Sequence, residues 1–137
     1  MRQILADTGA LVALLDRADL HHAWAVDCFK RLTPPLLTCE GVLAETLHLL
    51  SDLGPSVTAL RRLNNERILK VDFAFEPHAS AVWRTIEKYG DVPMSFTDGC
   101  LVRMSELHSD CVLWTTDSDF RVYRRHGRQV IPLLLPS

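Results

Sequence analysis

Short apolar runs alternate along the chain with longer stretches in which apolar and polar residues are mixed. The short runs predict strands, because they have the length and the flanking turn residues of buried strands. These strands are expected at residues 2–6, 36–39, 67–73, 111–115 and 129–134. The mixed stretches predict helices. They are expected at residues 10–15, 19–32, 41–53, 56–64, 77–89, 97–108 and 119–126.

Strands that alternate with helices pair in parallel, because a parallel pair needs a long crossover that a helix normally supplies. We therefore expect an α/β fold, a three-layer α/β/α sandwich with a short, mainly parallel sheet of four or five strands. Pro132 predicts that the last strand lies at an edge. Residues 1–137 are expected to form a single domain, since their number suits one core and no linker or repeat interrupts them.

Composition narrows the class of protein further. Apolar residues make up 47% of the chain and charged residues 23%, which excludes a disordered chain. Fifteen basic and seventeen acidic residues give a net charge of −2, so a globally basic nucleic-acid binder is excluded, although a local basic patch is not. No apolar run approaches the ~20 residues that span a bilayer. We expect a soluble, cytoplasmic protein without a membrane partner, whose four cysteines are buried, reduced thiols.

Two aspartates directly follow expected strands. Asp7 comes after the run 4–6, and Asp117 comes after the run 112–116. If these strands are parallel neighbours, both carboxylates emerge at the same edge of the sheet, where ligands of such sheets bind. Each aspartate taken singly is better explained as the N-cap of the next helix.

Two further carboxylates belong to expected helices. Asp98 ends the sequence Ser95-Phe96-Thr97-Asp98, which fits a capping box at the start of a helix. Glu45 lies in the middle of the expected helix 41–53, at the border of its apolar face. That face is expected to be centred on Leu43, Leu47 and Leu50.

These four acids suggest chemistry only in combination. Two like charges ~4 Å apart repel by ~4 kcal/mol at an effective dielectric constant near 20, so a cluster of carboxylates needs a cation to neutralise it. Mg²⁺ and Mn²⁺ prefer oxygen ligands, and such an ion activates water and stabilises charge on a phosphoryl oxygen. Clustering of Asp7, Glu45, Asp98 and Asp117 would therefore indicate a Mg²⁺ or Mn²⁺ site for phosphodiester chemistry.

Four segments of the chain resemble, in order, the four motifs of the PIN domain family, especially its VapC-like toxin branch. Ile4 to Asp16 resembles the first motif, and Val42 to Glu45 resembles the second. Ser95 to Asp98 is similar to the third, and Thr115 to Phe120 is similar to the fourth. The resemblance extends over nearly the whole chain. In the third motif, relatives often carry a further acid where this chain has Ser95.

The resemblance implies a PIN-like fold and a metal-dependent endoribonuclease, often the toxin of a toxin–antitoxin pair. It implies a homodimer and a small antitoxin protein as partner, with RNA as substrate and Mg²⁺ or Mn²⁺ as cofactor. Carried over by position, the catalytic and metal-binding acids are Asp7, Glu45, Asp98 and Asp117, with Asp119 as an additional candidate in the fourth motif. The supporting hydroxyl groups would be those of Thr8 and Thr116.

A cluster of basic residues follows the fourth motif directly. It consists of Arg121, Arg124, Arg125 and Arg128. Beside an acidic metal centre these side chains could hold the backbone of single-stranded RNA through phosphate contacts. A solvated face or a site for an acidic partner explains them equally well. Trp24, Trp83 and Trp114 lie within apolar patterns and are expected in the core.

Three other functions are alternatives to a toxin ribonuclease. The first is a housekeeping nuclease of the same fold, and the second is a non-catalytic RNA-binding or assembly module. The third is a phospho-acceptor receiver domain, which needs paired acids after the first strand and a lysine at the end of the last. Asp7 stands alone and no lysine follows Lys88, so the sequence disfavours a receiver.

Overall fold

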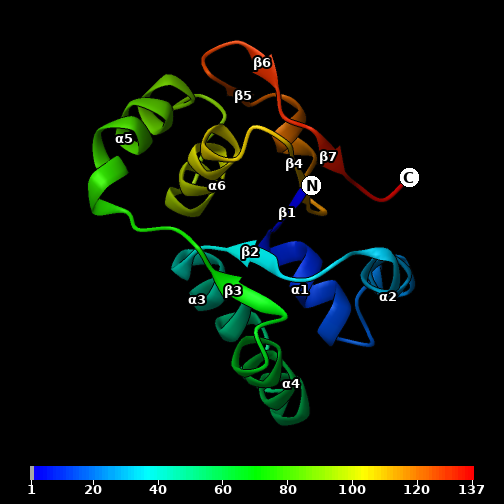
Figure 1. Cartoon of the computed structure of the whole chain (residues 1–137). Coiled ribbons are helices and arrows are strands. Elements are labelled where there is room, and N and C mark those ends of the chain that lie inside the picture. The colour runs from blue at the N-terminus through cyan, green and yellow to red at the C-terminus, as the bar shows by residue number, and fades with distance from the viewer. Residues whose placement is uncertain (1) are drawn as a thin grey trace.

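The protein is described here by a computed structural model covering residues 2–137. Five short strands form a parallel sheet with the order β3-β2-β1-β4-β7 (Figure 1). Their bounds are β1 Gln3–Ala6, β2 Leu36–Thr38, β3 Leu69–Val71, β4 Cys111–Trp114 and β7 Leu133–Leu134. The expected parallel α/β architecture is therefore confirmed.

Six α-helices connect and cover these strands. Their bounds are α1 Thr8–Leu15, α2 His22–Arg31, α3 Glu40–Leu49, α4 Gly54–Asn65, α5 Ala79–Lys88 and α6 Phe96–Leu107. Figure 1 shows α1 to α4 together on one side of the sheet and the pair α5 and α6 on the other. The layers follow from the connections, because right-handed crossovers in opposite directions along a sheet place their helices on opposite faces.

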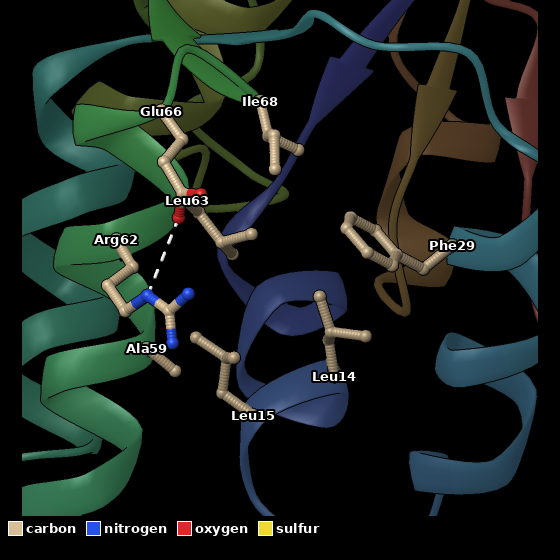
Figure 2. A pocket seen from close by; sticks show the side chains of 8 residues that line it. All are labelled: Leu14, Leu15, Phe29, Ala59, Arg62, Leu63, Glu66 and Ile68. Atoms are coloured by element: carbon tan, nitrogen blue, oxygen red, sulfur yellow. Dashed lines mark ion pairs between the residues drawn. The ribbon is translucent and has the colours of Figure 1, made fainter.

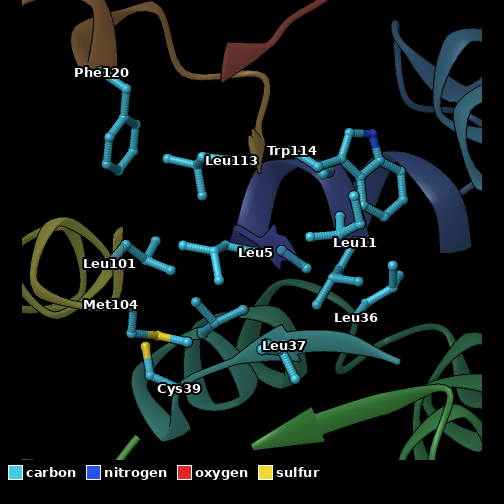
Figure 3. Packing of buried hydrophobic residues seen from close by; sticks show 14 of the residues in the cluster. Leu5, Leu11, Leu36, Leu37, Cys39, Leu101, Met104, Leu113, Trp114 and Phe120 are labelled. Atoms are coloured by element: carbon cyan, nitrogen blue, oxygen red, sulfur yellow. The ribbon is translucent and has the colours of Figure 1, made fainter. Parts of the chain in front are cut away.

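The core lies around the two central strands, β1 and β4. Leu5 of β1 and Leu113 of β4 are fully buried and are paired across the sheet. Figure 3 shows Leu11 from α1 packing on one side of these strands and Leu101 from α6 on the other. Strands covered on both faces are apolar at nearly every position, which explains why β4 and all of β1 after Gln3 appear in the sequence as apolar runs.

The segment after β4 differs from the sequence-based expectation. In place of a helix at 119–126, the structure has a 3₁₀-helix, η2, at Ser118–Arg121, followed by the antiparallel pair β5 Arg124–Arg125 and β6 Gln129–Val130. His126 and Gly127 both have positive φ angles, of 52° and 80°, and form the turn of this hairpin. A right-handed helix cannot continue through such residues.

The expected last strand, 129–134, is also divided in two. Its first part belongs to the hairpin as β6, and its second part, β7, joins the main sheet at the edge beside β4. Pro132 lies between the two parts and lacks the N–H that a continuous strand would use. The predicted edge position is correct, although the strand itself is only two residues long.

The predicted apolar face of α3 is correct at Leu50 and wrong at Leu47. The buried positions of this helix and its cap are Val42, Thr46 and Leu50, whereas Leu47 is exposed. Thr46 was overlooked because a hydroxyl-bearing side chain does not count toward an apolar pattern. Among the tryptophans, Trp114 is fully buried, but Trp83 is half exposed, so its predicted place in the core is wrong.

Two simpler expectations concern cysteines and membranes. The four cysteines, all among the described residues, are buried and unbridged, as expected. Within residues 2–137, none of the helices combines the length and the apolar character needed to cross a bilayer.

Candidate active site

Asp7 is fixed at the carboxyl end of the central strand β1. Its backbone N–H donates to the carbonyl oxygen of Trp114 at 3.0 Å, which extends the β1–β4 ladder by one residue. Its carboxylate caps α1 by accepting a hydrogen bond from the N–H of Thr8 at 2.7 Å, and it accepts another from Thr115 Oγ1 at 2.6 Å. Only 5% of its surface is exposed. The cap expected from the sequence is therefore present, on a carboxylate that faces the same sheet edge as Asp117.

Thr115 connects Asp7 to the acid that follows β4. Its hydroxyl oxygen accepts a hydrogen bond from the backbone N–H of Asp117 at 2.9 Å, while its O–H donates a hydrogen bond to Asp7 Oδ2. Asp117 in turn caps η2, since its Oδ1 accepts from the N–H of Asp119 at 2.9 Å. One buried threonine thus sets the spacing between two carboxylate-bearing residues.

Asp98 is held at the start of α6 by a capping box. The N–H of Asp98 donates to Ser95 Oγ at 3.0 Å, and the N–H of Ser95 donates to Asp98 Oδ2 at 3.4 Å. The hydroxyl of Tyr123 also donates to Asp98 Oδ2, at 3.3 Å. The capping and clustering roles of Asp98 therefore coexist in one side chain.

Glu45 joins the site through Thr8. The Thr8 hydroxyl donates to Glu45 Oε1 at 2.7 Å, while the Thr8 backbone N–H donates to Asp7. Glu45 is otherwise exposed on α3, in keeping with its expected position at the border of the apolar face. The supporting role expected of the Thr8 hydroxyl is consistent with this contact.

The charges of the aspartates act on one another. Burial, together with the nearby charges of Asp98 and Asp117, raises the pKa of Asp7 to about 7 although two hydrogen bonds oppose the change. Burial and the charge of Asp117 likewise raise the pKa of Asp98. Three carboxylates that are remote in the sequence therefore lie within electrostatic range of one another, at the carboxyl edge of β1 and β4.

The donor set suits a hard divalent cation, since it consists of carboxylate oxygens that destabilise one another's charge. A cation would favour the charged forms of Asp7 and Asp98, whose pKa values are raised by burial and, to a smaller extent, by the neighbouring carboxylates. Within residues 2–137, no three His, Cys, Asp or Glu side chains are arranged as a ready-made metal site. Asp119 is exposed on η2 and adds to the negative charge that acts on Tyr123.

Two glycines allow the helices of the site to approach closely. A Cβ atom on Gly9 would lie 2.0 Å from Thr116 Oγ1, and one on Gly41 would lie 2.5 Å from Thr97 Oγ1. Neither separation is sterically possible. The starts of α1 and α3 can therefore pack against the segments that carry Asp117 and Asp98 only because a hydrogen replaces the side chain.

The arginines after the fourth motif divide into two groups. Arg124 Nη1 donates to three carbonyl oxygens of residues 121–123, and the Arg125 guanidinium donates to the carbonyl oxygens of Ser105 and Ser109 at the end of α6. These two side chains thus have structural partners. Arg121 and Arg128 are exposed.

Two contributors were missed by sequence reasoning, Thr115 and Tyr123. The sequence pointed to Thr116 as the supporting hydroxyl of the fourth motif, but Thr115 makes the contact with Asp7, while Thr116 packs against Gly9. Strand alternation could have indicated Thr115, because it ends an otherwise apolar buried run. No local pattern indicates Tyr123, which reaches Asp98 across 25 residues.

An open pocket occurs elsewhere on the molecule. It has a volume of about 400 Å³ and lies between α1, α2 and α4 (Figure 2). Its lining is Leu14, Leu15, Phe29, Ala59, Arg62, Leu63, Glu66 and Ile68. None of the candidate acids belongs to this lining, so the carboxylate cluster, and not the pocket, defines the candidate active site.

Removal of the Tyr123 hydroxyl tests its hold on Asp98. We expect Tyr123→Phe to raise the pKa of Asp98 further, because the hydrogen bond it removes lowers that pKa, and to lower the free energy of unfolding by about 1 kcal/mol. NMR titration of the Asp98 carboxyl carbon measures the pKa, and denaturant unfolding measures the free energy of unfolding. Tyr89→Phe is the matched control, since the Tyr89 hydroxyl accepts from the N–H of Arg124 instead. An unchanged Asp98 titration in Tyr123→Phe would contradict the assignment.

The fold and the acids define an α/β protein with a carboxylate cluster at the carboxyl edge of its two central parallel strands. Residues 4–125 match the family model of the PIN domain. The chain belongs to the PIN domain family, as the four motifs suggested, and membership of this family supports a nuclease, a hydrolase of phosphodiester bonds.

Comparison with solved structures agrees with this fold. The crystal structure of VapC20 from Mycobacterium tuberculosis, described as a toxin that cleaves the sarcin–ricin loop, is similar with a TM-score of 0.78. The two sequences are 20% identical, and the match covers 88% of this chain and 94% of that chain. No curated protein matches the sequence.

Proposed function

We propose that the protein is a Mg²⁺- or Mn²⁺-dependent endoribonuclease. The observation that carries the proposal is the convergence of Asp7, Asp98 and Asp117. Burial, together with the charges of Asp98 and Asp117, raises the pKa of Asp7 to about 7. Such a cluster is unfavourable for the chain alone and is explained by a divalent cation that the carboxylates bind. Asp7, Asp98 and Asp117 are the proposed ligands, with Glu45 joined to them through Thr8 and Asp119 as a further candidate.

When bound, the cation supplies an activated water and stabilises charge on the phosphoryl oxygens. The residues of the chain position these groups. Thr115 and the N–H of Thr8 orient the Asp7 carboxylate, and Ser95 and Tyr123 orient that of Asp98. Because this chemistry needs no attack by the ribose 2′-hydroxyl, the products carry 5′-phosphate and 3′-hydroxyl ends.

We propose that RNA approaches along the exposed arginines next to η2. Arg121 and Arg128 are exposed and can contact phosphates, whereas Arg124 and Arg125 chiefly hold the hairpin and the end of α6 in place. Phosphate contacts of this kind position a strand without reading its sequence.

The biological setting proposed here is that of a toxin in a toxin–antitoxin pair. The description of VapC20 as a toxin and the match of its fold along most of both chains support this setting. In it, residues 1–137 form one cytoplasmic domain that pairs with a second copy and is inhibited by a small antitoxin protein.

Incubation of the purified protein with single-stranded RNA tests the activity. We expect cleavage with Mg²⁺ or Mn²⁺, none with excess chelator, and loss of at least about 100-fold in rate for Asp98→Asn, because even partners of metal ligands cost 10–100-fold when removed. Asp52→Asn, an exposed carboxylate beyond the far end of α3, is the matched control and should cleave normally. Cleavage that persists in chelator, or products with cyclic phosphate ends, would contradict the mechanism. RNA binding without cleavage would support the non-catalytic alternative.

A further inference from the structure

Three aromatic side chains form a cluster that is partly open to solvent, here called the aromatic patch: Phe75, Trp83 and Phe96. The ring centroids are 5.0 Å apart for Phe75 and Phe96, 5.9 Å for Trp83 and Phe96, and 6.2 Å for Phe75 and Trp83. Despite these contacts, Trp83 remains 50% exposed and Phe96 43% exposed. The rings therefore pack against one another and still present apolar surface outward.

The aromatic patch lies beside the carboxylate cluster. Phe96 is the first residue of α6, and Asp98 stands in the same helical turn, within the capping box that Ser95 begins. Phe75 comes from the segment that leaves the carboxyl end of β3, and Trp83 comes from α5, which packs along α6 (Figure 1). The patch thus belongs to the same edge of the sheet as the acids.

Cationic side chains also occur on α5, on a different face of the helix from Trp83. Arg84 follows Trp83 directly and lines a cavity of about 290 Å³ together with Lys88, Arg103 and His126. Glu106 is the only acid in that lining, and it is paired with Arg103 at 3.1 Å. Exposed aromatic rings are characteristic of surfaces that bind single-stranded nucleic acid, because bases stack on the rings.

We propose that Phe75, Trp83 and Phe96 form a stacking platform for unpaired bases of the RNA strand whose backbone is cleaved at the acids. The proposal rests on the proposed function and adds to it a base-binding site outside the four motifs. A protein partner would also cover apolar surface. The position of Phe96 in the same helical turn as Asp98 favours an RNA strand as the occupant.

The test is RNA binding in the presence of chelator, where no cleavage occurs. The ligand is a dye-labelled, unstructured RNA of about 12 nucleotides, within the range that one stacking surface covers. We expect Trp83→Ala and Phe96→Ala each to weaken binding about tenfold, and Trp83→Phe to retain most of it. Leu20→Ala is the matched control, because Leu20 is an apolar side chain 90% exposed outside the patch, and it should bind as the wild type does.

A second measurement separates stacking from charge and from misfolding. A strand of the same length that keeps the sugar-phosphate backbone but lacks bases should bind the wild type and Trp83→Ala equally. RNA should also quench the tryptophan emission of the wild-type chain, since Trp83 is the most exposed of its three tryptophans. This readout needs no variant, and its absence at saturating RNA would contradict the platform.

Other outcomes distinguish the platform from the activity. Unchanged RNA affinity in Trp83→Ala overturns the platform, and if that variant also changes from dimer to monomer in sedimentation, the patch is covered by a second copy. If the wild type cleaves RNA with Mn²⁺ and all patch variants bind RNA normally, the nuclease proposal stands and the platform is contradicted. If binding is weakened in the patch variants but the wild type does not cleave RNA with any metal, the platform is supported and the nuclease proposal is contradicted.

Discussion

Without divalent ions at pH 8, Asp7→Asn is expected to raise the free energy of unfolding by about 2–4 kcal/mol. Burial and neighbouring charges raise the pKa of Asp7 from 3.8 to about 7, a difference equivalent to about 4 kcal/mol against the charged form. Asparagine has nearly the same shape and removes that charge. Its side-chain oxygen can still accept from the N–H of Thr8, and its amide can donate to Thr115, so the cap is retained.

The gain in the free energy of unfolding for Asp7→Asn should increase with pH. Because the pKa of Asp7 is higher in the folded chain than in the unfolded chain, the folded state binds more protons between about pH 4 and pH 7. The contribution of Asp7 to stability therefore falls as the pH rises through this window. The difference between Asp7→Asn and the wild type should be near zero at pH 4 and reach its full size above pH 7.

Urea unfolding at a series of pH values in chelator measures this difference. Asp19→Asn is the matched control, because Asp19 also accepts a backbone hydrogen bond, from the N–H of His21, but belongs to no acid cluster. In parallel, Asp7→Asn should lose at least about 100-fold in RNA cleavage. A variant that is less stable than the wild type at every pH would mean that the Asp7 charge is needed for folding and would contradict the cluster argument.

The sequence predicted the parts of the fold that depend on local pattern. Apolar runs identified β1 and β4, and the Ser95–Asp98 sequence correctly indicated both the start of α6 and its capping box. Asp7, Asp98 and Asp117 could be proposed because each lies beside a strand end or a helix start, where local signals are strong, whereas Glu45 lies in the middle of α3 and depended on its motif. That Asp7 and Asp117 lie at one edge follows from parallel pairing of β1 with β4, which the alternation of elements implied.

The sequence-based predictions were wrong where contacts between residues distant in the sequence determine the local structure or the burial of a side chain. The segment after η2 was expected to be helical because of its composition, but the positive φ angles at His126 and Gly127 form a hairpin, and Arg125 is held by carbonyl groups of Ser105 and Ser109. Trp83 was expected in the core because its neighbours in α5 are apolar. Only the arrangement of α5 against α6 shows that its ring meets Phe96 at the surface.

Binding of Mn²⁺ is expected to displace the proton of Asp7, which gives the strongest test of that residue as a ligand. Since its pKa is about 7, the carboxyl is mostly protonated at pH 5.5, and the ion must compete with that proton. The apparent affinity should therefore be about 30-fold lower at pH 5.5 than at pH 8. About one proton should be released per ion at pH 5.5, and almost none at pH 8.

Calorimetric titration in two buffers of different ionisation enthalpy measures both the affinity and the number of protons. Thr115→Val provides a directional check, because it removes the side-chain hydrogen bond that most lowers the pKa of Asp7. In that variant the loss of affinity should begin at a higher pH than in the wild type, whereas Asp7→Asn should bind weakly and without this pH dependence. Equal affinity and no proton release from pH 5.5 to pH 8 in the wild type would mean that the ion binds elsewhere, since a ligand that is buried and protonated cannot be engaged without losing its proton.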